Sequence, residues 1–409
     1  MLPGMSTTFS SAHAALTESA RRTPHVIPAS LLLLVAVLVF WRIGQSDLRE
    51  WDESRNGVTA YEMARSGDFV NYTYGGELDT WSAKPPLMIW LVVLAYNVFG
   101  FNEFALRLPS AIAIILFFLY AYRLIALLAG RRQALLACLV LISSKAALGE
   151  HIGLTGDFDA LLLLFLTASA WHFVLFIDHA KARSAYLCAV FIGLAFLTKG
   201  TAAFVFLPGM VLYAIVRGRT RALLADRRVW IAAGIVALFV IFWSSLVLVY
   251  GKASGQSYYG SSNALETMLV HDTFRRMTSG DFGEIAKHDP LFFVKVLDTR
   301  MNGWNYFFIA SVIAGGVGLY RSRRALGAYL RGNERNAVVF SVCLIFPMII
   351  ALSFAANQHN WYLAPTFLFV AFLTVRGMHA LQERWKAFAW IFAVVLFFTF
   401  VRNVVAIGT

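Results

Sequence analysis

The amino-acid sequence predicts an all-α membrane protein that crosses the bilayer several times. Of its 409 residues, 59% are hydrophobic and only 14% are charged, which is more apolar surface than a soluble core of this size can bury. Apolar runs of about 17 to 25 residues, the length of a membrane-spanning helix, recur between residues 26 and 404. These runs are continuous and do not alternate with a period of two, so helices are predicted and not barrel strands.

About eleven of these segments are expected to cross the membrane. They lie near residues 26–44, 105–127, 134–150, 158–177, 184–198, 202–216, 229–250, 303–320, 337–355, 361–376 and 387–404. The basic residues between them set the orientation, because loops rich in Lys and Arg stay in the cytoplasm. The basic clusters are Arg131–Arg132, Lys181 with Arg183, Arg217 to Arg228, Arg321 to Arg335 and Arg376 to Lys386. With these clusters inside, the long loops lie outside.

The remaining segments complete this organisation. Arg21 and Arg22 precede the first apolar run, and no small-residue cleavage site follows it, so an uncleaved anchor with a cytoplasmic N-terminus is predicted. The expected parts are a cytoplasmic tail at 1–25, a transmembrane domain at 26–404 with outer loops at 45–104 and 251–302, and no separate C-terminal soluble domain. The apolar run at 85–99 is too short to span comfortably, so an interfacial or re-entrant helix is predicted there.

Charge and cysteine content argue against two other kinds of protein. The formal net charge is +12 at pH 7, but the basic residues are dispersed between apolar segments and form no single patch, so no nucleic-acid partner is expected. Cys138, Cys188 and Cys343 all lie within apolar runs and lack the spacing of metal ligands. They are predicted to be buried side chains and not a disulfide or a redox site.

The first outer loop opens with a pair of carboxylates, Asp52 and Glu53, in the stretch WDESR. They lie at the membrane face, where a carboxylate is costly unless it is paired or functional. A partly desolvated carboxylate could serve as a general base, with its pKa raised by burial and by its acidic neighbour. Arg55, three residues on, shares a helical face with Asp52 and is expected to hold it in place.

Four further ionisable residues are expected on the same face. His151, Asp157 and Asp159 lie in the turn between the third and fourth spans, and Lys199 lies at the outer end of the fifth. The two aspartates could cap the N-terminus of a helix or take part in catalysis, and their spacing fits both roles equally well. Lys199 could also be a residue that snorkels to the interface. Spacing alone leaves these alternatives open.

The second outer loop carries basic residues on the side where the orientation rule expects few. Its stretches LVHDTFRRM and KHDPLFF contain His271, Arg275, Arg276 and His288. An anionic ligand at the membrane surface is a natural reason for them, because Arg binds phosphate and carboxylate groups well. The outer face therefore combines carboxylates with candidate anion-binding groups.

Several of these stretches together resemble a known family. WDESRNGVTAYEMARSGDFV, WSAKPPLMIWL, FGFNEFALRLPSA, TGDFDALL and LTKG follow one another between about residues 40 and 210, and VHDTFRRM, HDPLFFV and NWYLAP come later in the expected order. In this order and spacing they resemble the GT-C glycosyltransferases that use polyprenyl-phosphate sugars. That group includes the protein O-mannosyltransferases and the bacterial lipid A aminoarabinose transferases. The resemblance implies a GT-C fold with juxtamembrane helices in the first outer loop.

The resemblance also implies roles for individual residues. Asp52 matches the catalytic carboxylate, with Glu53 beside it, and Asp159 or Asp157 matches a second acidic position. The basic positions that contact the lipid phosphate match Lys84 and either Arg275 or Arg276, with Arg55 and Lys199 as further candidates. Contacts to substrate, or to a divalent ion if one binds, are expected from His151, His271, His288 and Tyr362.

The expected activity is transfer of a sugar from a polyprenyl phosphate to a hydroxyl or phosphate of a glycolipid or protein acceptor. Asp52 would take the acceptor proton while the cations stabilise the departing phosphate, and a single displacement predicts inversion at the anomeric carbon. No cofactor is expected; a divalent metal is possible but not favoured, because no metal motif is present. A bacterial inner membrane with a periplasmic active site is the expected location.

Two other classes of function compete with this interpretation. A transporter or flippase of lipid-linked sugars would also need a phosphate site, but transporters place ionisable residues deep within their spans. A scaffold without activity gives no reason for Asp52, Lys84 and Asp159 to share one face. The transferase therefore ranks first, the transporter or flippase second and the scaffold third.

Overall fold

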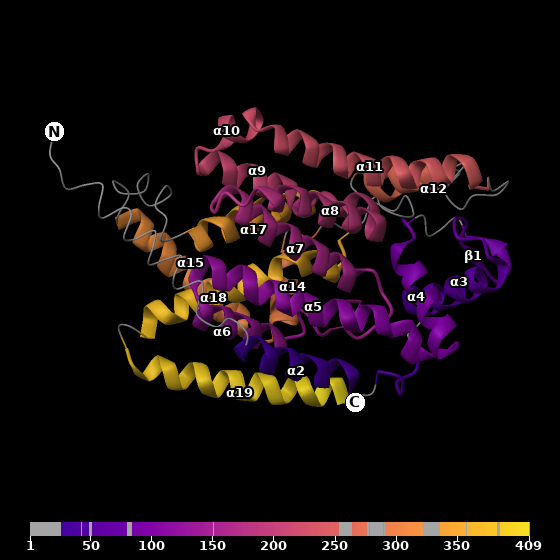
Figure 1. The fold of residues 1–409 in the computed structure, drawn as a ribbon. Coiled ribbons are helices and arrows are strands. Elements are labelled where there is room, and N and C mark those ends of the chain that lie inside the picture. The colour runs from indigo at the N-terminus through magenta and orange to yellow at the C-terminus, as the bar shows by residue number, and fades with distance from the viewer. Residues whose placement is uncertain are drawn as a thin grey trace.

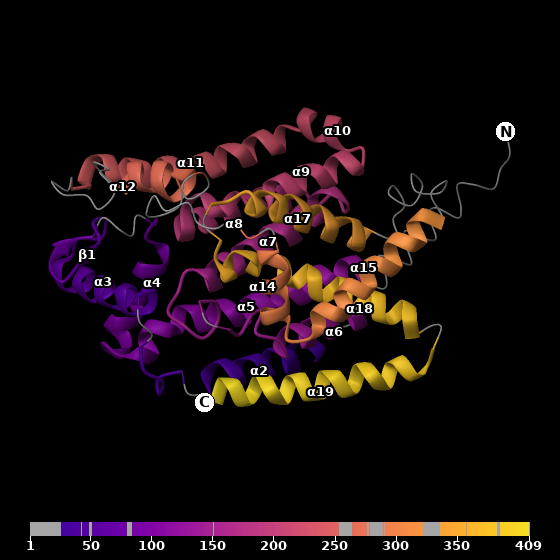
Figure 2. The ribbon, with the colours of Figure 1, turned by 180° about the vertical axis from the view of Figure 1, so that it is seen from behind.

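The structure, a computed structural model, is helical over most of the residues it describes. These are residues 26–41, 43–48, 51–79, 84–149, 151–252, 264–275, 278, 289, 291–321, 336–356, 358–382 and 385–408. Most of the helices run side by side along one direction, and this arrangement is visible from both sides (Figures 1 and 2). The predicted all-α fold is confirmed.

Two helices and a small hairpin lie at one end of the bundle (Figure 1). They are α3 (Asp52–Ser66), β1 (Thr73–Tyr74), β2 (Glu77–Leu78) and α4 (Leu87–Phe99). α3 begins with two acidic residues, which suit the positive end of the helix dipole, and it ends at Gly67, whose φ of 72° is left-handed. The strands are antiparallel, with Thr73 opposite Leu78. The helix predicted at 85–99 is present as α4.

The bundle itself consists of longer helices joined by short turns. They are α2 (Val26–Phe40), α5 (Glu103–Ala129), α6 (Arg131–Ile142), α7 (Asp159–Ile177), α8 (Ala182–Lys199), α9 (Leu207–Val216), α10 (Thr220–Ala225), α11 (Arg227–Tyr250), α14 (Phe292–Met301), α15 (Trp304–Arg321), α17 (Asn336–Ser353), α18 (Phe367–Gln382) and α19 (Ala387–Gly408). Shorter turns of helix are η1 (Gly200–Phe204), α12 (Ala264–Glu266), η2 (Thr267–Arg275) and η5 (Asn360–Thr366).

Apolar residues occur all around several of these helices, for two different reasons. α7 lies in the middle of the bundle, and most of its side chains are buried against α5 and α8. α11 and α19 lie at opposite edges (Figure 1) and expose large apolar side chains such as Leu248 and Trp390. A helix that is apolar on an exposed face suits a lipid environment.

Each predicted span contains a helix. Among the described residues, 6 helices are long and apolar enough to cross a membrane, namely α5, α7, α8 with η1, α11, η5 with α18, and α19. α2, α9, α15 and α17 are apolar but shorter. The multi-pass membrane fold is therefore confirmed, and the number of crossings stays a prediction.

The span predicted at 134–150 is wrong in its second half, because α6 ends at Ile142. Residues 143–149 form turns. The hydroxyl groups of Ser143 and Ser144 donate to backbone carbonyls three residues earlier, a local alternative to the helical pattern. Asn403 of α19 donates to the carbonyls of Ile142, at 2.7 Å, and Ser144, at 3.1 Å. A side chain 261 positions away thus donates a hydrogen bond to the last carbonyl group of this helix.

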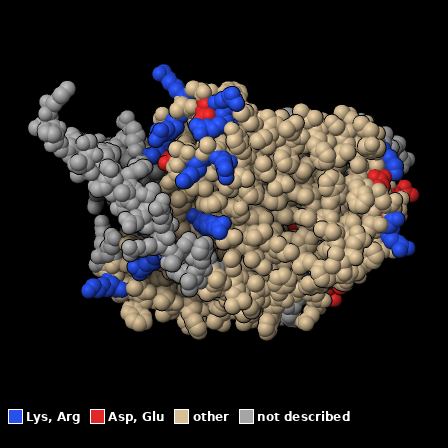
Figure 3. All heavy atoms as spheres, viewed as in Figure 1, with Lys and Arg blue, Asp and Glu red and all other residues tan. Residues whose placement is uncertain are grey.

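Charged side chains gather toward the two ends of the molecule. In Figure 3 most Lys and Arg residues lie at the end that carries α10, both signs of charge appear at the opposite end, and largely uncharged surface lies between them. We call the second of these the α3 end, after the helix that lies there. A broad uncharged belt between charged ends is the pattern expected of a protein that spans a bilayer.

The beginning of the second long loop is attached to the first at the α3 end. Asn71 donates to the carbonyl of Tyr250 at 3.0 Å and accepts from the backbone N–H of Lys252 at 2.7 Å. The ammonium of Lys252 also lies 2.9 Å from Asp68. These bonds bring residues of both expected outer loops to the same end of the bundle.

Candidate active site at the α3 end

Asp52 is placed by the start of α3, where its carboxylate is partly open to solvent. Its side chain is 38% exposed. The preceding residue, Trp51, has a φ of 67°, a left-handed value that costs energy for a residue with a side chain. His151, on the other side of the site, has a φ of 62°. Strained backbone of this kind is often found at functional sites, because the surrounding structure must hold it.

His151 brings two of the predicted carboxylates together. Its Nδ1 atom lies 3.2 Å from Asp157 and 3.7 Å from Asp52. Its ring stacks on Trp361 with 4.1 Å between the centroids, and Trp361 also stacks with His359. The hydrogen bond to Asp157, followed by the charges of Asp157, Asp52 and Asp159, raises the pKa of His151 above its usual value near 6.5 despite partial burial.

Asp159 and Lys199 form a buried ion pair next to this cluster. The ammonium of Lys199 lies 2.6 Å from each oxygen of Asp159. The idea that Lys199 only snorkels to the interface is therefore wrong, since its side chain is 15% exposed and paired with Asp159. Asp159 is the first residue of α7, but its carboxylate is held by Lys199 and no side chain caps this helix. This ion pair joins the first residue of α7 to the last residue of α8.

Lys84 approaches the same group of residues from the segment before α4. Its ammonium lies over the ring of Phe158, 4.7 Å from the centroid, in a cation–π contact. Phe158 lies between Asp157 and Asp159 in the sequence, and the positive charge of Lys84 is close enough to act on the Asp159 carboxylate. Lys84 forms no ion pair with any residue that the structure describes, so no described carboxylate neutralises its charge at short range.

Arg55 has a different partner from the one predicted. Its Nε and Nη2 atoms donate to the two oxygens of Asp79 at 2.6 and 2.7 Å, and its guanidinium lies over the ring of Tyr74. Arg55 is therefore hydrogen-bonded to Asp79, and Asp52 acts on it only through its charge. The hairpin returns Asp79 to the side of α3, and a bidentate pair is stronger than a contact along one helix.

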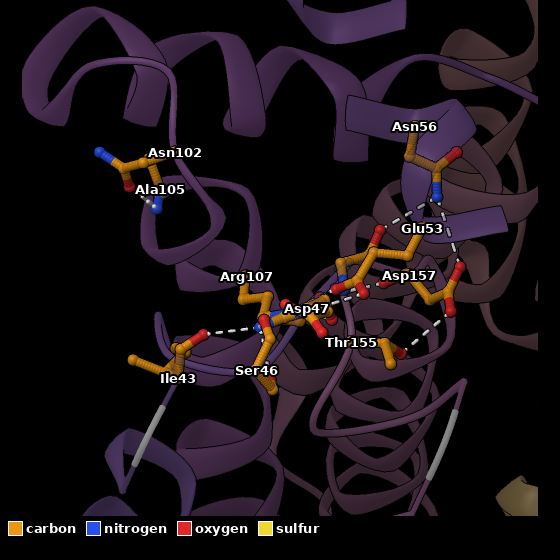
Figure 4. A network of polar contacts seen from close by, with 12 residues as sticks. Ile43, Ser46, Asp47, Glu53, Asn56, Asn102, Ala105, Arg107, Thr155 and Asp157 are labelled. Atoms are coloured by element: carbon orange, nitrogen blue, oxygen red, sulfur yellow. Dashed lines mark hydrogen bonds and ion pairs between the residues drawn. The ribbon is translucent and has the colours of Figure 1, made fainter. Parts of the chain in front are cut away.

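Glu53 does not share the environment of Asp52. Its side chain is 1% exposed, and its oxygens accept from Nε and Nη2 of Arg107 at 2.6 and 2.9 Å (Figure 4). The acidic neighbour that was expected to influence Asp52 is thus paired with a cation. A direct catalytic role for Glu53 is not supported by this geometry, because its carboxylate points into the protein.

Of the other predicted site residues, one lies near the site, and the side chains of the rest are not among those that the structure describes. Tyr362 follows Trp361 in η5, and its phenol is close enough to Lys199 to act on that ammonium electrostatically. The side chains of His271 and Arg275, and the whole of Arg276 and His288, lie outside the described residues. The phosphate-binding role expected of either arginine stays a prediction.

Sequence reasoning missed three residues that shape the site. Arg107 lies near the start of a predicted span, and a charge at such a position signals a partner. Asn56 is one helical turn beyond Asp52 and Glu53, so its position on α3 was the available signal. Trp361 is the first residue of a predicted span, where interfacial aromatic residues are common, and the sequence gives no signal of its stacking on His151.

Among the residues that the structure describes, Asp52, His151 and Asp157 could hold a divalent ion. One ligand atom from each lies within 4.8 Å of the others. A carboxylate, carboxylate and imidazole set suits Zn²⁺ or Mn²⁺. An imidazole must lose its proton to bind a metal, however, and the two carboxylates favour the protonated ring of His151.

The sequence is similar to one known family and to several curated bacterial proteins. Residues 83–245 match the family described as dolichyl-phosphate-mannose-protein mannosyltransferase. An undecaprenyl phosphate-alpha-4-amino-4-deoxy-L-arabinose arabinosyl transferase of Pseudomonas aeruginosa is 32% identical over 204 residues, which is 47% of this chain and 36% of that protein. A putative mannosyltransferase of Bacillus subtilis is 27% identical over 206 residues, 49% of this chain and 28% of that protein. The chain spans less than half the length of these curated relatives.

Two solved structures share the fold over most of this chain. ArnT from Cupriavidus metallidurans bound to undecaprenyl phosphate superposes with a TM-score of 0.67 at 19% identity, covering 90% of this chain and 63% of that one. The oligosaccharyltransferase of Archaeoglobus fulgidus superposes with a TM-score of 0.59 at 15% identity, covering 93% and 53%. At these identities the likeness establishes the architecture of the helices.

Proposed function

We propose, on the premise that this chain has the GT-C fold, that it moves a sugar from a polyprenyl phosphate to an acceptor at the outer face of a bacterial inner membrane. The solved relative that binds undecaprenyl phosphate supports this donor class. The observation that carries the proposal is the partly exposed carboxylate of Asp52 in one cluster with His151, Asp157 and the Asp159–Lys199 pair, with Lys84 beside it.

In the proposed reaction Asp52 accepts the proton of the acceptor hydroxyl or phosphate as its oxygen attacks the anomeric carbon. The bond from that carbon to the donor phosphate breaks, and the lipid phosphate leaves with the electron pair. Lys84, whose charge no described carboxylate neutralises at short range, stabilises this phosphate, together with Arg275 or Arg276. A single displacement inverts the anomeric carbon. The acceptor is a glycolipid or a protein.

We also propose that the reaction needs no metal. The imidazole of His151 contacts Asp52 and Asp157, which favour its protonated form, and in that form it supplies the positive charge that an ion would bring. The departing phosphate is then stabilised by the side chains of Lys and Arg, and no divalent ion has to bridge it.

The test is a transfer assay on the purified protein in lipid. The protein is incubated with a panel of radiolabelled polyprenyl-phosphate sugars and crude envelope acceptor, in buffer that contains a chelator. We expect label to move to an acceptor without added metal, and the active donor identifies the sugar. Loss of transfer in chelator, with recovery on adding a divalent ion, would contradict the metal-free mechanism. Movement of the lipid-linked sugar across the bilayer without transfer would favour a flippase.

The pH dependence of transfer should report His151. Its protonated ring holds two carboxylates, so we expect transfer to fall as pH rises through its pKa, which lies above 6.5. Because folding raises this pKa, the same proton stabilises the folded protein below pH 6.5, and that contribution is lost as pH rises through the folded-state value. The measurement is the initial rate against pH for the wild type and His151→Gln.

His172→Gln is the control, because His172 lies thirteen residues beyond Asp159 in α7, about 20 Å along the helix. It should keep the alkaline fall of the wild type, whereas His151→Gln should lack it. An unchanged alkaline fall in His151→Gln would show that another group titrates.

A further inference from the structure

Arg107 lies where three segments of the chain meet, and it is almost completely buried. Its Nη1 atom donates to the carbonyl of Ile43 and to both oxygens of Ser46, and its Nη2 atom donates to the carbonyl of Asp47 (Figure 4). Its Nε and Nη2 atoms also bind Glu53. The guanidinium therefore fixes the segment after α2 and the first turn of α3 against α5.

Glu53 extends this network into the turn that carries Asp157. The same oxygen that binds Nε of Arg107 also accepts the backbone N–H of Gly156 at 2.8 Å. One turn further along α3, Asn56 donates to the carbonyl of Gly156 at 3.0 Å and to Asp157 at 3.3 Å. α3 thus holds Gly156 by both its N–H and its carbonyl group.

The turn also packs directly on α5 at Gly156. A Cβ atom at this position would lie 2.7 Å from Cγ of Leu106, the neighbour of Arg107, so a side chain would push the turn away. Thr155 donates to the other oxygen of Asp157 at 3.0 Å. The position of the Asp157 carboxylate is therefore set by contacts with α3, with α5 and within its own turn.

We propose that Glu53 and Arg107 are positioning residues for sugar transfer. Asp52 precedes Glu53 in the turn of α3 that is hydrogen-bonded to Gly156. The Glu53–Arg107 ion pair therefore fixes the Asp52 and Asp157 carboxylates relative to His151, and neither residue of the pair contacts the substrate. This inference rests on the proposed function for its consequence in catalysis. A buried, fully hydrogen-bonded pair suits the role, because such a network has one arrangement and resists displacement.

The test compares Glu53→Gln with a matched buried pair elsewhere. Asp178 and Arg217, at the other end of α7, form a buried ion pair with 3.5 Å between their atoms, so Asp178→Asn controls for the loss of a buried charge pair as such. Asn56→Ala removes the hydrogen bond to the carbonyl of Gly156 and leaves no buried charge unpaired. This variant therefore tests the proposal even if Glu53→Gln folds poorly. All variants are purified at full length in lipid.

The first readout is hydrogen exchange of the peptide that contains residues 155–157. We expect Glu53→Gln and Asn56→Ala to lose protection there and Asp178→Asn to keep it. The second readout is kinetic: kcat per folded molecule should fall about 10- to 100-fold in Glu53→Gln while KM for the donor stays near the wild-type value, because misplaced catalytic groups slow the chemical step. Asp178→Asn should change neither constant.

Unchanged protection at 155–157 in Glu53→Gln would overturn the proposal, whether or not the protein transfers sugar. So would a kcat per folded molecule equal to that of Asp178→Asn. If the wild type transfers no sugar from any donor, the proposed function fails, and the exchange readout still decides whether Glu53 holds the turn.

Discussion

Asp52→Asn is expected to abolish transfer while leaving donor binding largely intact. The amide keeps the shape of the side chain but cannot take the acceptor proton, and loss of a general base costs about 10²- to 10⁴-fold in rate. Asp52 is suited to this role because its carboxylate is partly exposed, whereas Asp157 and Asp159 are buried. The measurement is the initial rate with labelled donor, together with equilibrium binding of the same donor.

Glu77→Gln is the matched control, since Glu77 is an exposed carboxylate of β2 in the same loop. Its transfer rate should equal that of the wild type. Normal turnover by Asp52→Asn would refute the assignment of the base. A parallel loss of donor binding would instead indicate that Asp52 contacts the donor.

Breaking the Asp159–Lys199 pair should strongly destabilise the fold. Lys199→Met leaves the Asp159 carboxylate buried without its cation, and Asp159→Asn leaves the Lys199 ammonium without its anion. Removing one partner of a buried pair costs about 3 to 5 kcal/mol in the free energy of unfolding. Thermal unfolding of the purified variants in lipid or detergent measures this loss.

The double variant Asp159→Asn with Lys199→Met separates folding from catalysis. With both charges removed we expect most of the lost stability to return, because no uncompensated charge stays buried. Transfer should stay impaired if Asp159 takes part in the reaction. Lys295→Met, which breaks an exposed pair with Asp289, is the control and should change stability little. Single variants at Asp159 or Lys199 that match this control would disprove the buried-pair argument.

The sequence predicted the helices and the face of the site far better than the partners within it. Apolar runs and basic loops located the helices, and the separation of charge between outer loops and spans placed Asp52, His151 and Asp157 on one face. Periodicity along one helix suggested that Arg55 holds Asp52. The bond to Asp79 depends on a hairpin that returns the chain, which local spacing does not encode.

Long-range side-chain contacts also explain the other differences. α6 ends early because Asn403 and two serines satisfy its last carbonyls, and these groups lie far apart in the sequence. Glu53 and Asp52 are neighbours in the chain, yet their environments differ because Arg107 forms an ion pair with Glu53 and not with Asp52. Composition cannot distinguish two adjacent carboxylates; only the folded contacts do.

The hydrogen bonds from Asn403 set an order of events during biosynthesis. The turn at 143–149, which leads to His151, is synthesised long before the helix whose side chain binds its carbonyl groups. At roughly 5 to 20 residues per second, a ribosome needs about 13 to 52 s to translate the 261 residues between Ile142 and Asn403. During most of that interval Asp52, His151 and Asp157 are already part of the chain, while this turn lacks the hydrogen bonds from Asn403. The proposed site is therefore expected to reach its final form only after α19 has inserted.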